Sequence, residues 1–153
     1  AVKDVYVYHE IGEIEDDTFD TDQWREIVSC FAHTPVELLA RTLKDLLADT
    51  GPKGTLPRLI RERKKAAIGF YTAFFDGLAR AVFPALRSGF DRFVTDGDWD
   101  ALAAVVANGN RTVSAAVRTL SSIFEEGRRR RDPAWTKKEV SRRLIDPFQH
   151  PAA

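Results

Sequence analysis

The residues of this sequence best suited to chemistry are three histidines and one cysteine, which could act as metal ligands, general bases or a nucleophile. His9, His33 and His150 are expected in an N-terminal arm, at a helix end and in a C-terminal tail, without the spacing of metal ligands. Cys30 falls on the expected apolar face of a helix, where burial keeps a thiol protonated. The sequence therefore predicts no catalytic residue, no metal site, no cofactor and no enzyme activity.

Charge is balanced overall but uneven along the chain. The 153 residues carry 23 Lys plus Arg and 23 Asp plus Glu, so net charge does not steer the protein toward nucleic acid or membranes. Residues 1–22 are strongly acidic, and they lack the spacing of a calcium loop. Residues 128–146 are strongly basic. We therefore expect an acidic head and a basic tail.

Aromatic and basic residues at the two ends are the expected partner contacts. The opening segment, with its β-branched and aromatic residues, could run extended against a partner. Near the other end, a run of arginines precedes a tryptophan and two lysines. Such basic runs either bind phosphate or form solvated helix faces that meet acidic protein surfaces. The predicted contact residues are Tyr6, Tyr8, Arg128, Arg129, Arg130, Arg131, Trp135, Lys137 and Lys138.

Apolar residues recur at helical spacing from Thr21 onward, and almost nothing predicts a strand. Asp, Thr and Pro residues indicate helix starts, whereas Gly and Gly-Pro or Gly-Asn pairs indicate turns. The expected boundaries are Asp22, Thr34, Gly51, Thr55, Pro84, Asp98, Gly109, Gly127, Asp132 and Pro147. A single long helix is expected between Thr55 and Phe75, and the next helix near residues 84–93. A hairpin with its turn at Gly109 is expected after it.

Two segments suggest an internal repeat. Trp24-Arg25-Glu26-Ile27 aligns with Trp99-Asp100-Ala101-Leu102 at an offset of 75 residues, and the run 41–43 aligns with 118–120 at an offset of 77. That offset leaves room for one more hairpin between the two segments, with a period typical of helical solenoids. Because the two tryptophans recur on apolar stripes, they are expected in the core.

Residues 98–133 resemble a pentatricopeptide repeat, through Leu102, the expected Gly109 turn and the segment 124–127 before Asp132-Pro133. Arrays of that family usually read single-stranded RNA. Here Arg25-Glu26 and Asp100-Ala101 occupy the places where an amide or hydroxyl would read a base. A short degenerate array of this kind resembles the extra F1 subunit of euglenozoan mitochondrial ATP synthases, which binds the α subunit and performs no chemistry.

The expected fold is therefore all-α, a short right-handed stack of about three helical hairpins plus a C-terminal helix and an extended arm. The domains would be an arm over 1–21, a repeat domain over 22–146 and a tail over 147–153. The expected function is a non-catalytic accessory subunit of a mitochondrial assembly, with RNA binding as the alternative. A single cysteine indicates a reducing compartment, the absence of Met suggests a removed presequence, and no membrane span is expected.

Overall fold

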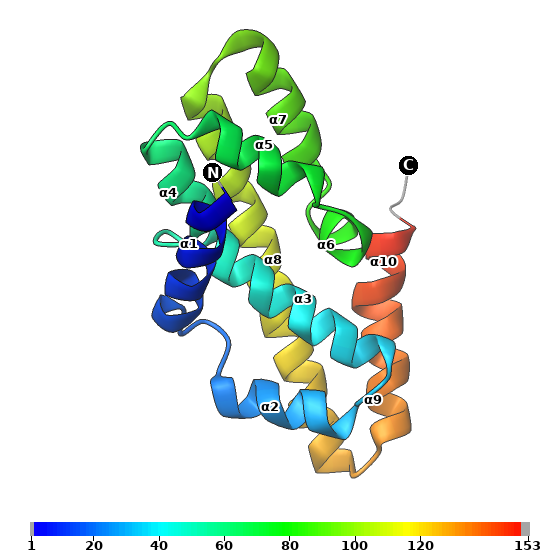
Figure 1. Ribbon diagram of the computed structural model, residues 1–153. Helices are drawn as coiled ribbons and strands as arrows, with labels where there is room; N and C mark the ends of the chain where they lie inside the picture. Colours follow the sequence, from blue (N-terminus) through cyan, green and yellow to red (C-terminus); the bar gives the residue numbers. More distant parts are fainter. Residues whose placement is uncertain (1, 151–153) are drawn as a thin grey trace.

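The computed structural model describes residues 2–150 and is helical throughout, with no strand in that range (Figure 1). The all-α prediction is therefore confirmed. The elements are α1 (Val2–Glu15), α2 (Thr21–Cys30), α3 (Pro35–Thr50), α4 (Thr55–Arg61), α5 (Lys65–Ala73), α6 (Gly77–Val82), α7 (Ala85–Asp96), α8 (Trp99–Arg130), α9 (Pro133–Val140), a π-helical turn η1 (Ser141–Ile145) and α10 (Asp146–Gln149).

The long helix α8 is the centre of the fold, and α3 runs beside it through the middle of the molecule (Figure 1). Helix α7 packs on the first part of α8, and α9 packs back on its last part. Their apolar stripes form one core, because each amphipathic helix buries one face against its neighbours. The largest fully buried side chains include Leu39, Leu43, Leu46, Leu56, Ile68, Leu86, Leu102, Leu120 and Ile123.

The N-terminal segment is a helix, so the predicted extended arm over residues 1–21 is wrong. Helix α1 packs on α3, and Val5 and Tyr8 contact the core from it. Gly12 lies against the backbone of Ala48, at a distance that a Cβ atom could not occupy. This close packing outweighs the β-propensity of the opening residues, which is a weak local preference.

Helix α8 also contradicts the predicted repeat. The chain stays helical through Gly109 and Asn110, where a hairpin turn was expected, and reaches Arg130 without interruption. Gly109 lies against the ring of Phe83, so it provides space for a close side chain and does not form a turn. The Trp24 segment forms the short helix α2 before α3, whereas the Trp99 segment begins this single helix. The two aligned segments fold differently, and the predicted stack of three hairpins is not what the chain forms.

Several predicted helix boundaries are also different. The helix expected from Thr55 to Phe75 is divided into α4 and α5, because Arg63 adopts a left-handed conformation with φ 53° between them. Gly127 does not end α8, which closes at Arg131 with φ 54°. Asp20, not Asp22, caps α2 by accepting from the backbone of residues 22 and 23.

The predicted tail from residue 147 begins inside a helix. Pro147 lies in the first turn of α10, and the π-helical turn η1 connects that helix to α9 without a break. Residues 151–153 of the predicted tail lie outside the described residues. Other predictions hold: Asp98 caps α8, Pro35 occupies the first turn of α3, and Asp132 caps α9.

None of the helices within residues 2–150 combines the length and the apolarity needed to cross a membrane. Helix α8 is long enough, but charged residues occur along its exposed side.

Candidate functional site

A buried carboxylate on α3, Asp49, accepts hydrogen bonds from three other helices. Thr55 Oγ1, at the start of α4, lies 2.6 Å from Asp49 Oδ1, and Tyr71 Oη on α5 lies 2.7 Å from Oδ2. His9 Nδ1 on α1 lies 2.9 Å from Oδ1. A carboxylate whose side chain is only 9% exposed needs such donors, because burial removes its hydration. Asp49 therefore joins α1, α3, α4 and α5 at one point.

The charge of His9 is set by this contact. The hydrogen bond to Asp49 raises the pKa of His9 from 6.5 to about 9; partial burial opposes the shift, and the negative charges of Asp49, Asp45 and Glu13 add to it. Without a competing ligand His9 is therefore a cation at neutral pH. A protonated imidazole cannot accept a proton, so His9 in this state is an ion-pair partner and not a general base.

Tyr71 is held in its neutral form. Its burial, together with the charge and hydrogen bond of Asp49, raises the pKa of Tyr71 well above the ordinary value. The phenol therefore keeps its proton and donates a hydrogen bond to the carboxylate. This arrangement resembles a structural network more than a catalytic relay, because every group in it is satisfied by another.

Two further carboxylates lie beside His9. Glu13 is one helical turn after it on α1, and Asp45 is one turn before Asp49 on α3. Ligand atoms of His9, Glu13 and Asp45 all lie within 4.8 Å of one another. Partial desolvation raises the pKa of Asp45, and the neighbouring carboxylates add to that rise while His9 opposes it. Lys44 Nζ lies 3.0 Å from Glu13 Oε1 and offsets part of the negative charge.

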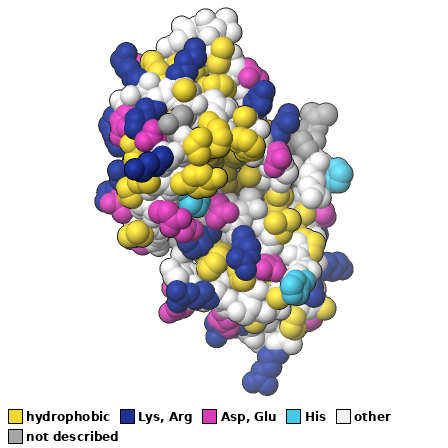
Figure 2. All heavy atoms as spheres, viewed as in Figure 1, with side chains coloured by type: hydrophobic (Ala, Val, Ile, Leu, Met, Phe, Trp, Pro, Cys, Tyr) yellow, Lys and Arg dark blue, Asp and Glu magenta, His cyan; other side chains and the backbone are white. Residues whose placement is uncertain are grey.

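An apolar hollow of about 330 Å³ opens beside this group, between α1 and α5. We call it the aromatic hollow; it is lined by Val5, Tyr6, Asp49, Phe70, Tyr71, Phe74 and Phe75. Tyr6 is 65% exposed and Phe74 is 71% exposed, which is unusual for rings of this size. Figure 2 shows a hollowed hydrophobic patch at the level of α5, with acidic side chains and a histidine along its lower edge. The hollow therefore combines exposed aromatic rings with negative charge.

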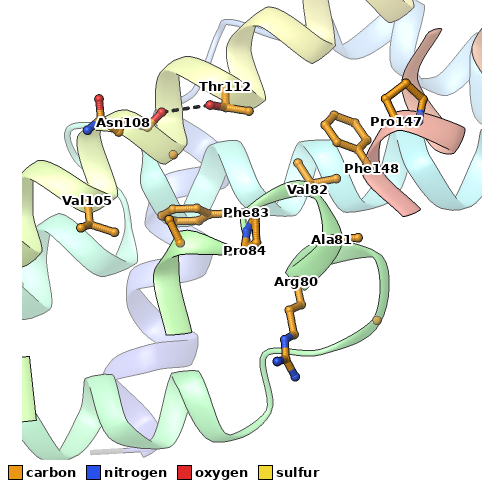
Figure 3. Close-up of a pocket in the computed structure, with 13 residues that line it drawn as sticks. Arg80, Ala81, Val82, Phe83, Pro84, Val105, Asn108, Thr112, Pro147 and Phe148 are labelled. Atoms are coloured by element: carbon orange, nitrogen blue, oxygen red, sulfur yellow. Dashed lines mark hydrogen bonds between the residues drawn. The ribbon is translucent and has the colours of Figure 1, made fainter. Parts of the chain in front are cut away.

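A larger hollow of about 670 Å³ lies between α6, α7, α8 and α10. Figure 3 shows Phe83 and Pro84 below α8, with Phe148 facing them from α10 and Arg80 pointing away. The hydroxyl of Thr112 on its α8 wall donates to the backbone carbonyl of Asn108 at 3.3 Å. No converging set of charged groups lines this hollow, so its chemistry is less distinctive than that of the aromatic hollow.

The predicted contacts at the N-terminus are divided between two environments. Tyr6 lines the aromatic hollow. Tyr8 is instead engaged within the chain: its hydroxyl donates to Glu62 Oε2 at 2.7 Å and accepts from Lys64 Nζ at 3.0 Å. The Arg58 guanidinium also lies over the Tyr8 ring, 5.7 Å from its centroid. Tyr8 therefore fastens α1 to the α4–α5 connection.

The predicted basic contacts lie far along the chain, at the end of α8 and on α9. Arg128 pairs with Glu26 of α2 at 3.0 Å, and both Arg129 and Arg130 pair with Glu126. Arg130 also stacks over Trp135, 4.5 Å from its ring centroid. Arg131, Lys137 and Lys138 are exposed. The structure thus brings Arg130 and Trp135 together, while much of the arginine charge is paired with nearby acids.

The other reactive residues do not join this region. Cys30 is exposed at the end of α2, so the prediction that it packs on an apolar face is wrong. His33 lies in the α2–α3 turn with φ 61°. Trp24 and Trp99 pack against the core as predicted, although both are only partly buried.

The His9 group was not predicted, because residues 1–21 were expected to form an extended arm. A helical reading would have placed His9 and Glu13 one turn apart on one face, as it would Asp45 and Asp49. That spacing is the signal that could have found the group. The pairing of the two helices is a tertiary contact that no local pattern encodes.

Comparison with known proteins places the chain in a family. Residues 1–143 match a family of unknown function, the DUF6866 C-terminal domain. No curated protein and no solved structure matches the chain significantly. Because the match covers most of the chain, the chain belongs to this family.

Proposed function

We propose that this member of the DUF6866 C-terminal domain family is a non-catalytic binding module that holds a partner protein in the aromatic hollow. The observation that supports the proposal is the exposure of two aromatic rings, Tyr6 and Phe74, on the rim of one hollow. Aromatic side chains that are exposed in the free protein and line a concave site are frequent binding hot spots, because they bury a large area on association.

Spacing along the two helices extends this surface. Val2 lies one turn before Tyr6 on α1 and is 46% exposed, and Phe70 of α5 lies four residues before Phe74, which directly follows that helix. The rings of Phe70 and Phe74 contact each other, with centroids 4.9 Å apart. Exposed Val2, Tyr6 and Phe74 and the partly exposed Phe70 therefore form one apolar patch at the hollow, and such a patch is a typical mark of a protein interaction site.

The negative charge beside the hollow defines the chemistry of the partner. Asp49 lies in the wall of the hollow. Glu13 lies one helical turn from His9, and Asp45 lies one helical turn from Asp49. We expect the partner to insert an aliphatic or aromatic side chain into the hollow and to place a basic residue near these carboxylates. The basic residue would contribute specificity and association rate more than affinity.

The test begins with affinity purification and cross-linking of the protein from its source cells, followed by binding measurements with the purified partner. Phe74→Ala and Tyr6→Ala should each weaken binding by about tenfold, because each removes a ring at the centre of the contact. Leu38→Ala is the matched control, since Leu38 is an exposed apolar side chain at the opposite end of α3. If the partner binds both ring variants and the wild type equally, the proposal is wrong.

A narrower form of the proposal places the partner in a mitochondrial assembly, with the F1 part of ATP synthase and its α subunit as the specific case. The helical content of the chain supports it, but the continuous α8 removes the support that a hairpin repeat would give. Co-migration with a large complex on a native gel tests it. The RNA-binding alternative has less support, because Arg128 to Arg130 pair with acids of the same chain.

A further inference from the structure

We propose that His9, Glu13 and Asp45 bind a divalent transition-metal ion of the Zn²⁺ class, with Asp49 holding the histidine ring in place. The site would lie between α1 and α3, beside the aromatic hollow. Its ligands do not include the exposed rings, so zinc binding can be tested separately from partner docking through variants of Tyr6 and Phe74.

The two helices supply the site in matching pairs. His9 and Glu13 are four residues apart on α1, and Asp45 and Asp49 are four residues apart on α3, so each pair lies on one helix face. Facing helices that each project such a pair are a common way to build a metal site in a helical protein. Here the ligand atoms of His9, Glu13 and Asp45 lie within 4.8 Å of one another.

That separation is close to what coordination needs. Ligands at about 2.1 Å from a tetrahedral zinc ion lie roughly 3.4 Å from each other. The Glu13 and Asp45 carboxylates would therefore move toward the held His9 ring by roughly 1–1.5 Å, a distance that side-chain rotation can supply. Asp45 is exposed and Glu13 is partly exposed, so both carboxylates have room to rotate.

Asp49 gives His9 the support that metal-binding histidines usually have. It is buried, and it accepts from His9 Nδ1 at 2.9 Å while Thr55 and Tyr71 fix its own position. With Nδ1 engaged, Nε2 is the nitrogen available to a ligand, and its proton would be released to the solvent when the ion binds. A carboxylate on the far ring nitrogen fixes the tautomer and makes the bound nitrogen more basic.

The set of donors decides the class of ion. One imidazole nitrogen with two carboxylates suits Zn²⁺ or Co²⁺, whereas Ca²⁺ and Mg²⁺ prefer sites made of oxygen alone. Lys44 would compete, because its Nζ lies 3.0 Å from Glu13 Oε1. The ion must displace the Lys44 ammonium from Glu13 before this carboxylate can coordinate it. Removing the Lys44 charge should therefore strengthen binding.

The experiment is titration of chelator-treated full-length protein with Zn²⁺, followed by calorimetry. We expect one equivalent to bind, and His9→Gln, Glu13→Gln and Asp45→Asn should each weaken it at least tenfold. Asp45→Asn is the most useful of the three, because this exposed residue can change without loss of the fold. Lys44→Gln should bind more tightly than the wild type.

Matched controls separate this site from other zinc ligands in the chain. The first control, Glu10→Gln, changes an exposed carboxylate on α1. The second control combines Cys30→Ser and His33→Gln, and it removes two zinc donors at the end of α2 and in the turn after it. Both controls should bind as the wild type does. Co²⁺ should give a visible spectrum that His9→Gln abolishes. The proposal is overturned if the wild type binds no stoichiometric Zn²⁺, or if Asp45→Asn and His9→Gln bind it unchanged.

Discussion

The ring of Phe83 lies against the backbone of Gly109, so closely that a Cβ atom at position 109 would overlap it. Phe83 is buried, and Figure 3 shows its ring below α8 near Asn108. The contact fixes the α6–α7 connection on the central helix. It also explains why a glycine stands in the middle of a continuous helix, where its backbone freedom is otherwise a disadvantage.

Gly109→Ala should therefore destabilise the protein. Alanine would gain about 1 kcal/mol in helix propensity, but forcing the ring aside costs roughly 1–3 kcal/mol, so we expect a net loss of up to about 2 kcal/mol. Urea unfolding followed by circular dichroism measures it. Gly69→Ala is the control, because its Cβ would meet Phe90 at an ordinary 3.4 Å. That variant should be neutral or more stable, and equal behaviour of the two would contradict the overlap.

Variants that remove one or all of the hydrogen bonds to Asp49 should lower the free energy of unfolding by increasing amounts. Tyr71→Phe removes one neutral donor, so it should lower the free energy of unfolding by about 1–2 kcal/mol. Asp49→Ala leaves Thr55, Tyr71 and His9 without their acceptor, so it should cost about 3 kcal/mol or more.

Tyr6→Phe is the control for this series, because the Tyr6 ring is mostly exposed. It should change stability by less than about 0.5 kcal/mol. The network would have no structural role if Tyr71→Phe and Tyr6→Phe unfolded at the same urea concentration.

Local patterns predicted the features that depend on neighbours in sequence. Asp98 caps α8 by accepting from the backbone of residues 100 and 101, and Pro35 begins α3, because these effects act within one helical turn. Pro84 separates α6 from α7 for the same reason.

Features set by tertiary contacts were not predictable in this way. Gly109 and Asn110 are a residue pair typical of turns, and only the position of Phe83 shows that Gly109 serves close packing. The opening residues have β-propensity, but packing of α1 on α3 makes them helical. His9 and Asp49 are 40 residues apart, so their contact depends on that same helix pairing.

Protonation of His9 predicts how stability changes with pH in protein freed of metal by a chelator. The pKa of His9 is about 9 in the folded protein and 6.5 as the ordinary value, so the folded state holds the proton more tightly. This contribution is fully present below about pH 6.5 and is lost as pH rises through 9. Asp49, Asp45 and Glu13 face the ring, and all three favour its charged form.

We therefore expect the free energy of unfolding of the wild type to fall by at most about 3 kcal/mol between pH 6.5 and pH 9.5. Urea unfolding at half-unit intervals of pH measures the slope. His9→Gln should be less stable at pH 6.5 and nearly flat over this range, because glutamine can donate to Asp49 but carries no proton to lose. His33→Gln should keep the wild-type slope, since its ring lies in the α2–α3 turn. A flat wild-type profile, or a slope that survives His9→Gln, would show that the pair with Asp49 does not control the titration.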